Sequence, residues 1–229
     1  VLAVLLICVA ICCIFGFING IVISYLQVPA FIGTLGMQLI VYGVCLVYTN
    51  ATPIGGYHNA YTAVAKGKLF GAIPFLFLIA LAVGLVMWFI YNMTPHGKYM
   101  YAIGGNEQSA LMMGLNVRRV KLKAYILDGF LCGVGSVLFC LNTLGGFVEQ
   151  AKGFEMDAIA SSVIGGTLLT GGVGNVFGTL FGVLIKATIE AFITFQGTLS
   201  SWWTRITIAA LLCFFIVLQS ILAMVKKKK

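Results

Sequence analysis

The stretch LAVLLICVAICCIFGFINGIVISYL, residues 2–26, decides the fold class. It holds no Lys, Arg, Asp or Glu, and the charge-free run continues to residue 65. About 20 apolar residues suffice for one helix to cross a bilayer, so a run of this length must cross more than once. Backbone groups in lipid must bond within their own segment, and the alternating strands of a barrel are absent. The chain is therefore predicted to be an all-α, polytopic transmembrane helical bundle.

Composition supports the same class. Of the 229 residues, 61% are hydrophobic and 9% are charged, whereas roughly 25% are charged in a soluble domain. The net charge of +8 could indicate nucleic-acid binding, but most positive residues lie in two clusters beside apolar spans, as cytoplasmic anchors do. No nucleic-acid partner is expected. The seven cysteines lie in apolar runs without a CxxC pair, which favours free thiols over disulfides or a metal site.

Prolines, glycines and polar loops divide the chain into about seven membrane elements. The predicted elements are residues 2–26, 31–49, 69–91, 124–144, 158–173, 174–195 and a last span that begins at Arg205. The fifth is short and rich in glycine, so we predict a broken or re-entrant element, which is allowed only where it packs in protein or lines a cavity. Residues 50–68 form a polar loop outside the bilayer.

The whole chain, residues 1–229, is predicted to form one transmembrane domain with a cytoplasmic loop at about 92–123. Nine positive residues fall on the side of this loop and of the C-terminus, against four on the other side. The excess of positive charge places that side, and the C-terminus, in the cytoplasm. The chain starts within an apolar run and without Met, so its N-terminal spans are expected to be missing.

Charges and glycines within the spans have structural interpretations. Lys186 and Glu190 are four residues apart and are predicted to pair on one helix face. Asp128 is predicted to pair with Lys121, Lys123 or Arg119, although a direct role in transport stays open for each of these charges. Two sets of small residues are predicted to let helices pack closely: Gly16 and Gly20 in the first span, and Gly174, Gly178 and Gly182 in the sixth element.

The sequence GGNEQSALMMGLNV, residues 104–117, is a polar island in this apolar chain. It is predicted to form a short helix that opens after Asn106, carries Glu107 in its first turn and closes at Gly114. Arg118 and Arg119 follow directly. We expect this helix to lie outside the lipid and to be contacted by another protein.

Four blocks of sequence together resemble the bacterial monosaccharide ABC transporter permeases, the group that includes the ribose and galactose/methyl-galactoside importers. The residues that carry the resemblance are Ala102 to Glu107 with Ala110, Gly114, Asn116 and Val117; Val28 to Gly36; Asp157 to Ala160; and Gly165 to Thr167 with Gly171 to Gly174, Gly178 and Gly182. The resemblance extends over nearly the whole chain in order and spacing. One departure is Leu168-Leu169-Thr170, where the family more often has Ser-Leu-Ser.

The resemblance implies a permease subunit in the bacterial inner membrane that translocates a galactose-, methyl-galactoside- or ribose-like monosaccharide. Its partners would be a second permease copy, an extracytoplasmic sugar-binding protein and a cytoplasmic ABC ATPase. The chain has no GxxxxGK[ST] phosphate loop, so it is expected to bind no cofactor and to leave ATP and Mg²⁺ to the ATPase. The residues expected to couple it to the ATPase are Asn106, Glu107, Ala110, Gly114 and Leu115.

The translocation route is predicted to involve polar groups and glycines that permit helix breaks. These residues are Asn142, Gly165, Gly166, Thr167, Thr170, Gly171 and Gly172. The alternative is that the glycines only let helices pack. An ion-coupled secondary transporter or channel would need a carboxylate at mid-membrane, whereas Asp128 and Glu190 lie near span ends. A membrane enzyme is disfavoured because the two histidines are far apart and no acids cluster, so no catalytic residues are expected.

Overall fold

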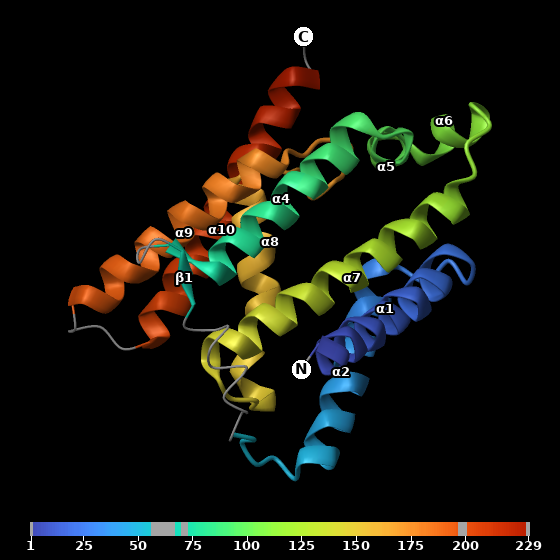
Figure 1. Ribbon diagram of the computed structural model, residues 1–229. Helices are drawn as coiled ribbons and strands as arrows, with labels where there is room; N and C mark the ends of the chain where they lie inside the picture. Colours follow the sequence, from blue (N-terminus) through green and yellow to red (C-terminus); the bar gives the residue numbers. More distant parts are fainter. Residues whose placement is uncertain (1, 56–66, 70–72, 197–200, 228–229) are drawn as a thin grey trace. The chain divides into compact units, whose positions relative to one another are not determined.

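The computed structural model describes residues 2–55, 67–69, 73–196 and 201–227, and helices dominate them (Figure 1). The elements in chain order are α1 (Leu2–Ser24), α2 (Ala30–Thr49), β1 (Lys68–Leu69), β2 (Ile73–Pro74), α4 (Phe75–Met93), α5 (Pro95–Gly105), α6 (Glu107–Met112), α7 (Val117–Thr143), the 3-10 helix η1 (Val148–Ala151), α8 (Phe154–Ile164), α9 (Val176–Gln196) and α10 (Ser201–Lys227). Among the described residues, five helices, α1, α2, α4, α7 and α9, are long and apolar enough to cross a membrane. The predicted polytopic helical fold is confirmed at this level.

The helices group into two compact units. Unit 1 comprises Val1–Val86 and Glu107–Lys152, and unit 2 comprises Met87–Asn106 and Gly153–Lys229. The division runs between Asn106 and Glu107, within the polar island that the sequence singled out.

In unit 1, α1 and α7 lie side by side along most of their lengths (Figure 1). Glycines on both helices bring the backbones together. A Cβ atom at Gly16 would lie 2.9 Å from the Cα of Gly129, and one at Gly133 would lie 2.8 Å from the Cα of Val9. No larger residue fits at these positions without moving the backbone, which confirms the predicted packing seam in the first span.

The turn between α1 and α2 is tight. Gln27 has the left-handed φ of 55°, and α2 begins directly after Pro29, where the sequence predicted a break. At its other end α2 closes at Asn50, whose N–H donates to the carbonyl of Leu46. Of the predicted polar loop at 50–68, residues 56–66 lie outside the described residues.

A hydrogen-bonded bridge joins the segment after α2 to the segment after α7. Ile54 and Gly146 exchange backbone hydrogen bonds of 2.8 Å in both directions. The Tyr42 hydroxyl lies 3.3 Å from a carboxylate oxygen of Glu149, and the Lys152 ammonium lies 5.7 Å from the centre of the Tyr42 ring. These contacts hold α2 against η1.

Several helix starts differ from the prediction, among them those of α8 at Phe154 and α10 at Ser201, which were predicted at residue 158 and Arg205. The third span begins at Phe75 instead of residue 69, because Pro74 and the preceding residue disfavour helix and pair as β2 with β1. The fourth span begins at Val117 instead of residue 124, because the Asn116 side chain accepts a hydrogen bond from the Arg119 N–H and caps the helix. Residues 95–105, predicted as loop, form α5.

The sequence contains the signals for the helix that we missed. Thr94 caps α5 by accepting from the Gly97 N–H at 3.4 Å, and Pro95 occupies the first helical position. Thr followed by Pro is a common way to begin a helix.

In unit 2, α8 packs against α9, and α8 ends at Ile164 after only 11 residues. A non-helical segment at 165–175 follows, with left-handed φ values at Gly166, Gly171 and Gly172. The predicted break in this element is therefore confirmed. The glycine stripe of α9 packs as predicted: a Cβ atom at Gly178 would collide with the carbonyl of Gly165, and one at Gly182 with the carbonyl of Ser161.

The end of α8 receives hydrogen bonds from α10. The Gln219 amide nitrogen donates to the carbonyl of Val163 at 3.0 Å and to that of Thr167 at 3.3 Å. The last carbonyls of a helix have no partner within the helix, and in an apolar environment they need one from elsewhere. The Val163 carbonyl also accepts from the Gly166 N–H at 3.0 Å, so Gln219 gives it a second donor and also donates to the Thr167 carbonyl beyond the end of α8.

Candidate functional site

The predicted coupling helix is α6, and its boundaries follow the predicted capping pattern. The helix opens at Glu107, and Gly114 adopts a φ of +81° just after its end. The Gly114 N–H donates to the carbonyl of Leu111 at 3.0 Å, and the Leu115 N–H donates to that of Ala110 at 3.1 Å. Bonds of this kind satisfy the last carbonyls of a helix that stops at a left-handed glycine.

An ion pair fastens α6 to α7. The carboxylate of Glu107 lies 2.7 Å from the ammonium of Lys121, and the two side chains are 50% and 32% exposed. The predicted pairing of Asp128 with Lys121 is thus wrong, and Asp128 takes part in none of the ion pairs within the described residues. Asp128 lies seven positions after Lys121 in the helix, a rise of roughly 10 Å that keeps the two groups apart.

The start of α6 exposes the polar residues Glu107, Gln108 and Ser109, whereas its end and the residue after it expose apolar side chains. Leu111, Met112 and Met113 are 54%, 89% and 66% exposed, whereas Ala110 is completely buried and Leu115 is half-buried. Ala110 therefore contributes its small size to packing within the chain, and the methionines provide the protruding apolar side chains. These methionines were not among the predicted coupling residues, although flexible methionines are frequent at surfaces that bind other proteins.

In unit 2, the end of α5 meets the break after α8. A Cβ atom at Gly104 would lie 2.7 Å from the backbone nitrogen of Gly172, and one at Gly172 would lie 2.7 Å from the Cα of Gly105. We call this contact the glycine joint. The Tyr101 hydroxyl adds a 2.9 Å hydrogen bond to the carbonyl of Gly174. Asn106 ends α5 and donates its N–H to the carbonyl of Ala102.

The glycine joint borders a cavity of about 340 Å³. Thr167, Gly171 and Gly172, three of the residues predicted for the translocation route, line it together with Tyr101 and Gly104. The sequence predicted the loop and the break as separate sites, and the structure brings their glycines into contact. Tyr101 was not predicted, and nothing in its sequence context links it to residue 174.

The other predicted route residues lie elsewhere. Gly165 packs against the backbone of Gly178, which is the structural alternative considered for these glycines. Gly166 has open space around it and a φ of +90°, so glycine is required there by the backbone conformation. Thr170 is exposed. Asn142 is exposed near the end of α7, in the other unit.

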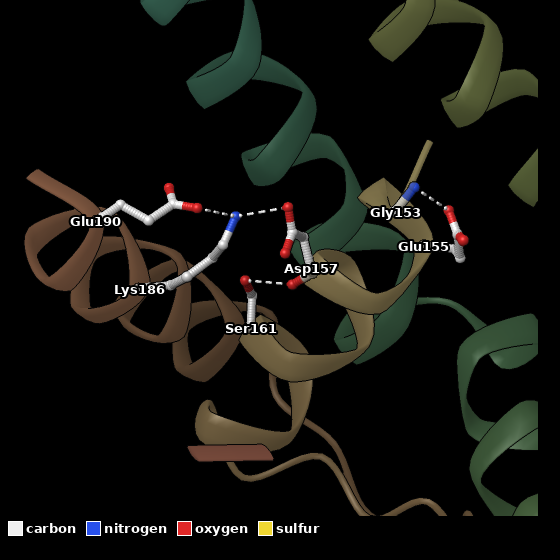
Figure 2. Close-up of polar contacts among 6 residues, drawn as sticks. All are labelled: Gly153, Glu155, Asp157, Ser161, Lys186 and Glu190. Atoms are coloured by element: carbon white, nitrogen blue, oxygen red, sulfur yellow. Dashed lines mark hydrogen bonds and ion pairs between the residues drawn. The ribbon is translucent and has the colours of Figure 1, made fainter. Parts of the chain in front are cut away.

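A group of three charges links α8 to α9 (Figure 2). The ammonium of Lys186 lies 3.1 Å from Glu190, which confirms the predicted pair, and 3.0 Å from Asp157 of α8. Figure 2 shows the ammonium between the two carboxylates, while the Ser161 hydroxyl donates to the backbone carbonyl of Asp157 at 2.8 Å. We call these three residues the charged triad. Sequence reasoning missed Asp157 because it lies 29 residues before Lys186, beyond any helical spacing.

The charged triad is suited to joining helices. Lys186 is 16% exposed, and its partners Asp157 and Glu190 are 29% and 36% exposed. An ammonium with three donors can satisfy two carboxylates at once, so each charge in this apolar region has an opposite charge beside it. The structural interpretation of Lys186 and Glu190 therefore agrees with the geometry.

Comparison with known proteins gives concordant results. Residues 1–216 match the family described as "Branched-chain amino acid transport system / permease component". The inner membrane ABC transporter permease protein YjfF of Escherichia coli is 43% identical over 212 residues, which cover 90% of this chain and 63% of that protein. The galactose/methyl galactoside import permease protein MglC of Salmonella typhimurium is 36% identical over 229 residues, covering 96% of this chain and 67% of that protein.

A ribose importer is also related. The ribose import permease protein RbsC of Bacillus subtilis is 36% identical over 183 residues, covering 80% of this chain and 57% of that protein. The chain thus spans about two thirds or less of the length of these relatives. No solved structure matches it. The predicted resemblance to monosaccharide ABC transporter permeases is confirmed by these relatives, and the chain belongs to the family of ABC transport system permease components that its residues 1–216 match.

Proposed function

We propose that the chain is the membrane-spanning permease subunit of an ABC importer that takes up a monosaccharide of the galactose, methyl-galactoside or ribose type. The similarity to import permeases for these sugars over 80–96% of the chain carries the proposal. The subunit would act in a bacterial inner membrane, with its C-terminus in the cytoplasm on the side that holds more positive residues. About seven membrane elements would result from the five long helices, α8 with its break, and the apolar part of α10.

The proposed partners follow from the import role. A second permease copy would complete the pore, an extracytoplasmic binding protein would deliver the sugar, and a cytoplasmic ABC ATPase would bind ATP and Mg²⁺. In this arrangement the chain itself binds no cofactor and catalyses no reaction. The sugar route would lie at the cavity beside the glycine joint, where Thr167 and the nearby backbone offer hydrogen bonds to a neutral cargo.

We propose α6 as the contact for the ATPase. Met112 at the end of the helix and Met113 just after it are exposed, while Glu107 pairs with Lys121 of α7. A push on α6 can change the transport state only if the ATPase contacts differ between the inward-open and outward-open states. The glycine joint packs the end of α5, which directly precedes α6, against the break after α8. A displacement of α5 and α6 would therefore change the conformation of residues 165–175.

In this mechanism, some parts of the chain stay rigid and one part changes conformation. The α1–α7 pair, packed backbone to backbone over its length, would stay rigid during transport. The break at 165–175 would change conformation, because glycines with positive φ can adopt several backbone conformations at low cost. The charged triad and Gln219 would keep the ends of α8 attached while the segment after it moves.

Reconstitution tests the function. The full chain is placed in proteoliposomes with an ABC ATPase and a sugar-binding protein from the same organism, and uptake of labelled galactose and ribose is measured. We expect uptake that requires both ATP and the binding protein. Uptake that depends on an ion gradient and does not need the ATPase would contradict this proposal and indicate an ion-coupled transporter. A variant of the ATPase that cannot hydrolyse ATP is the matched control.

A further inference from the structure

A second cavity lies in unit 1, where the ends of three membrane-spanning helices meet. It has a volume of about 490 Å³ and is bordered by the last turn of α1, the first residues of α2 and the first turn of α7. We call it the helix-end pocket. It shares none of the residues that line the cavity at the glycine joint.

One buried hydroxyl in the helix-end pocket has no partner. Ser24 is 4% exposed and lines the pocket, and its Oγ makes no hydrogen bond to any described residue. A buried polar atom without a partner is unfavourable, and a bound group that accepts its hydrogen bond would remove this cost. Gln27, which also lines the pocket, adopts a left-handed φ of 55° that is uncommon for a residue other than glycine.

The electrostatics of the helix-end pocket favour an anion. The first turns of α2 and of α7 both border it, and neither contains an acidic residue. The start of α2, at Pro29, has no side-chain cap among the described residues, so the first N–H groups of this helix remain available. The charged residues that line the pocket are Arg118, Lys121 and Glu107, and the Glu107 carboxylate pairs with Lys121. The lining thus has a net charge of +1.

We propose that the helix-end pocket binds a phosphate group, contributed by the headgroup of an anionic phospholipid. The phosphate oxygens would accept hydrogen bonds from Ser24, from the first N–H groups of α2 and from Arg118. The remaining lining includes Ile23, Val28 and Leu111, which are apolar and offer a surface for the start of the acyl chains. Anionic lipids are bound in basic pockets between membrane helices in this way.

A lipid bound in the helix-end pocket would contact several segments of unit 1. A bound headgroup would bridge the α1–α2 turn to α6 and to the start of α7, since residues of all these segments line the pocket. It would therefore steady the base of α6 independently of which sugar the protein carries.

The test uses the full chain purified in neutral detergent. Native mass spectrometry measures how much phosphatidylglycerol or phosphatidylcholine each variant retains. We expect the wild type to retain phosphatidylglycerol in preference to phosphatidylcholine. Arg118→Gln should bind it roughly fivefold more weakly, as expected for the loss of one basic contact. Ser24→Ala should also weaken binding. Arg119→Gln is the matched control, because it removes the same charge from the neighbouring residue, which does not line the pocket.

Several results would overturn the proposal. Equal losses in Arg118→Gln and Arg119→Gln would indicate general surface charge instead of a pocket. Equal retention of phosphatidylcholine would exclude recognition of an anionic headgroup. A third arm titrates inorganic phosphate and follows the thermal unfolding midpoint. If phosphate raises the midpoint in an Arg118-dependent manner while phosphatidylglycerol does not bind, the source is free phosphate and not lipid.

Discussion

Two helix contacts within the chain use glycine in different ways. The α1–α7 contact joins two helices of 23 and 27 residues through glycines on both of them, such as Gly16 and Gly129. The α8–α9 contact joins a helix of 11 residues to one of 21 and adds the charged triad, and Gln219 of α10 donates hydrogen bonds at the end of α8. Glycine alone thus suffices where both helices are long. A helix that stops short needs polar groups to hold its ends.

The largest effect is expected where glycine alone makes the contact. A Cβ atom at Gly129 would lie 2.6 Å from the carbonyl oxygen of Cys12, so Gly129→Leu must push α1 and α7 apart. We expect a loss of more than about 3 kcal/mol in the free energy of unfolding, above the usual range for overpacking because backbone atoms must move. Gly135→Leu on the same helix has open space and should cost less than about 1 kcal/mol. Thermal unfolding in detergent measures both, and similar midpoints would contradict the close contact.

The charged triad should give the next largest effect. Lys186→Met leaves Asp157 and Glu190 close together without a cation, and breaking a buried pair typically costs about 3–5 kcal/mol. Because these side chains keep 16–36% exposure, we expect about half of that. Unfolding midpoints would be compared with those of Lys186→Arg, which keeps the charge. Combining Lys186→Met with Asp157→Asn and Glu190→Gln should restore much of the loss, and a further loss in the combined variant would refute the pairing.

The glycine joint should affect transport more than stability. Gly104→Ala places a methyl group 2.7 Å from the backbone nitrogen of Gly172, whereas at Gly105 the nearest atom is 4.0 Å away. We expect Gly104→Ala to cost about 1–2 kcal/mol and to slow sugar uptake severalfold, with Gly105→Ala close to wild type in both respects. Uptake normalised to folded protein distinguishes the two. Equal uptake by both variants would show that the joint does not transmit motion.

The smallest effect on stability is expected for the ion pair of α6. Glu107 and Lys121 are 50% and 32% exposed, and exposed pairs contribute less than about 1 kcal/mol. Glu107→Gln should therefore unfold at nearly the wild-type temperature and yet reduce sugar-stimulated ATPase activity of the complex. Gln108→Glu, at the neighbouring exposed position, is the control for a change in charge. If Glu107→Gln keeps full sugar-stimulated ATPase activity, Glu107 is not part of the coupling contact.

The fold was predictable because apolar runs and helix signals are local. Residues 2–26 and 31–49 gave helices within two residues of the expected bounds, and the capping pattern around Glu107 and Gly114 was recognised. Errors arose where a signal was overlooked, as with Thr94 and Pro95 at the start of α5. The site was only partly predictable. The pair Lys186 and Glu190 follows from helical spacing, but the contacts of Asp157, Gln219 and Tyr101 join residues far apart in sequence.

In the proposed mechanism, the break at 165–175 moves during transport while the α1–α7 pair does not. Hydrogen–deuterium exchange of the full complex, without nucleotide and trapped with ATP, tests this difference. We predict that amides in residues 165–175 change their exchange rate at least severalfold between the two states, and that amides of α1 and α7 around Gly16 and Gly129 do not change. Identical exchange at 165–175 in both states, or a change confined to α1 and α7, would contradict it.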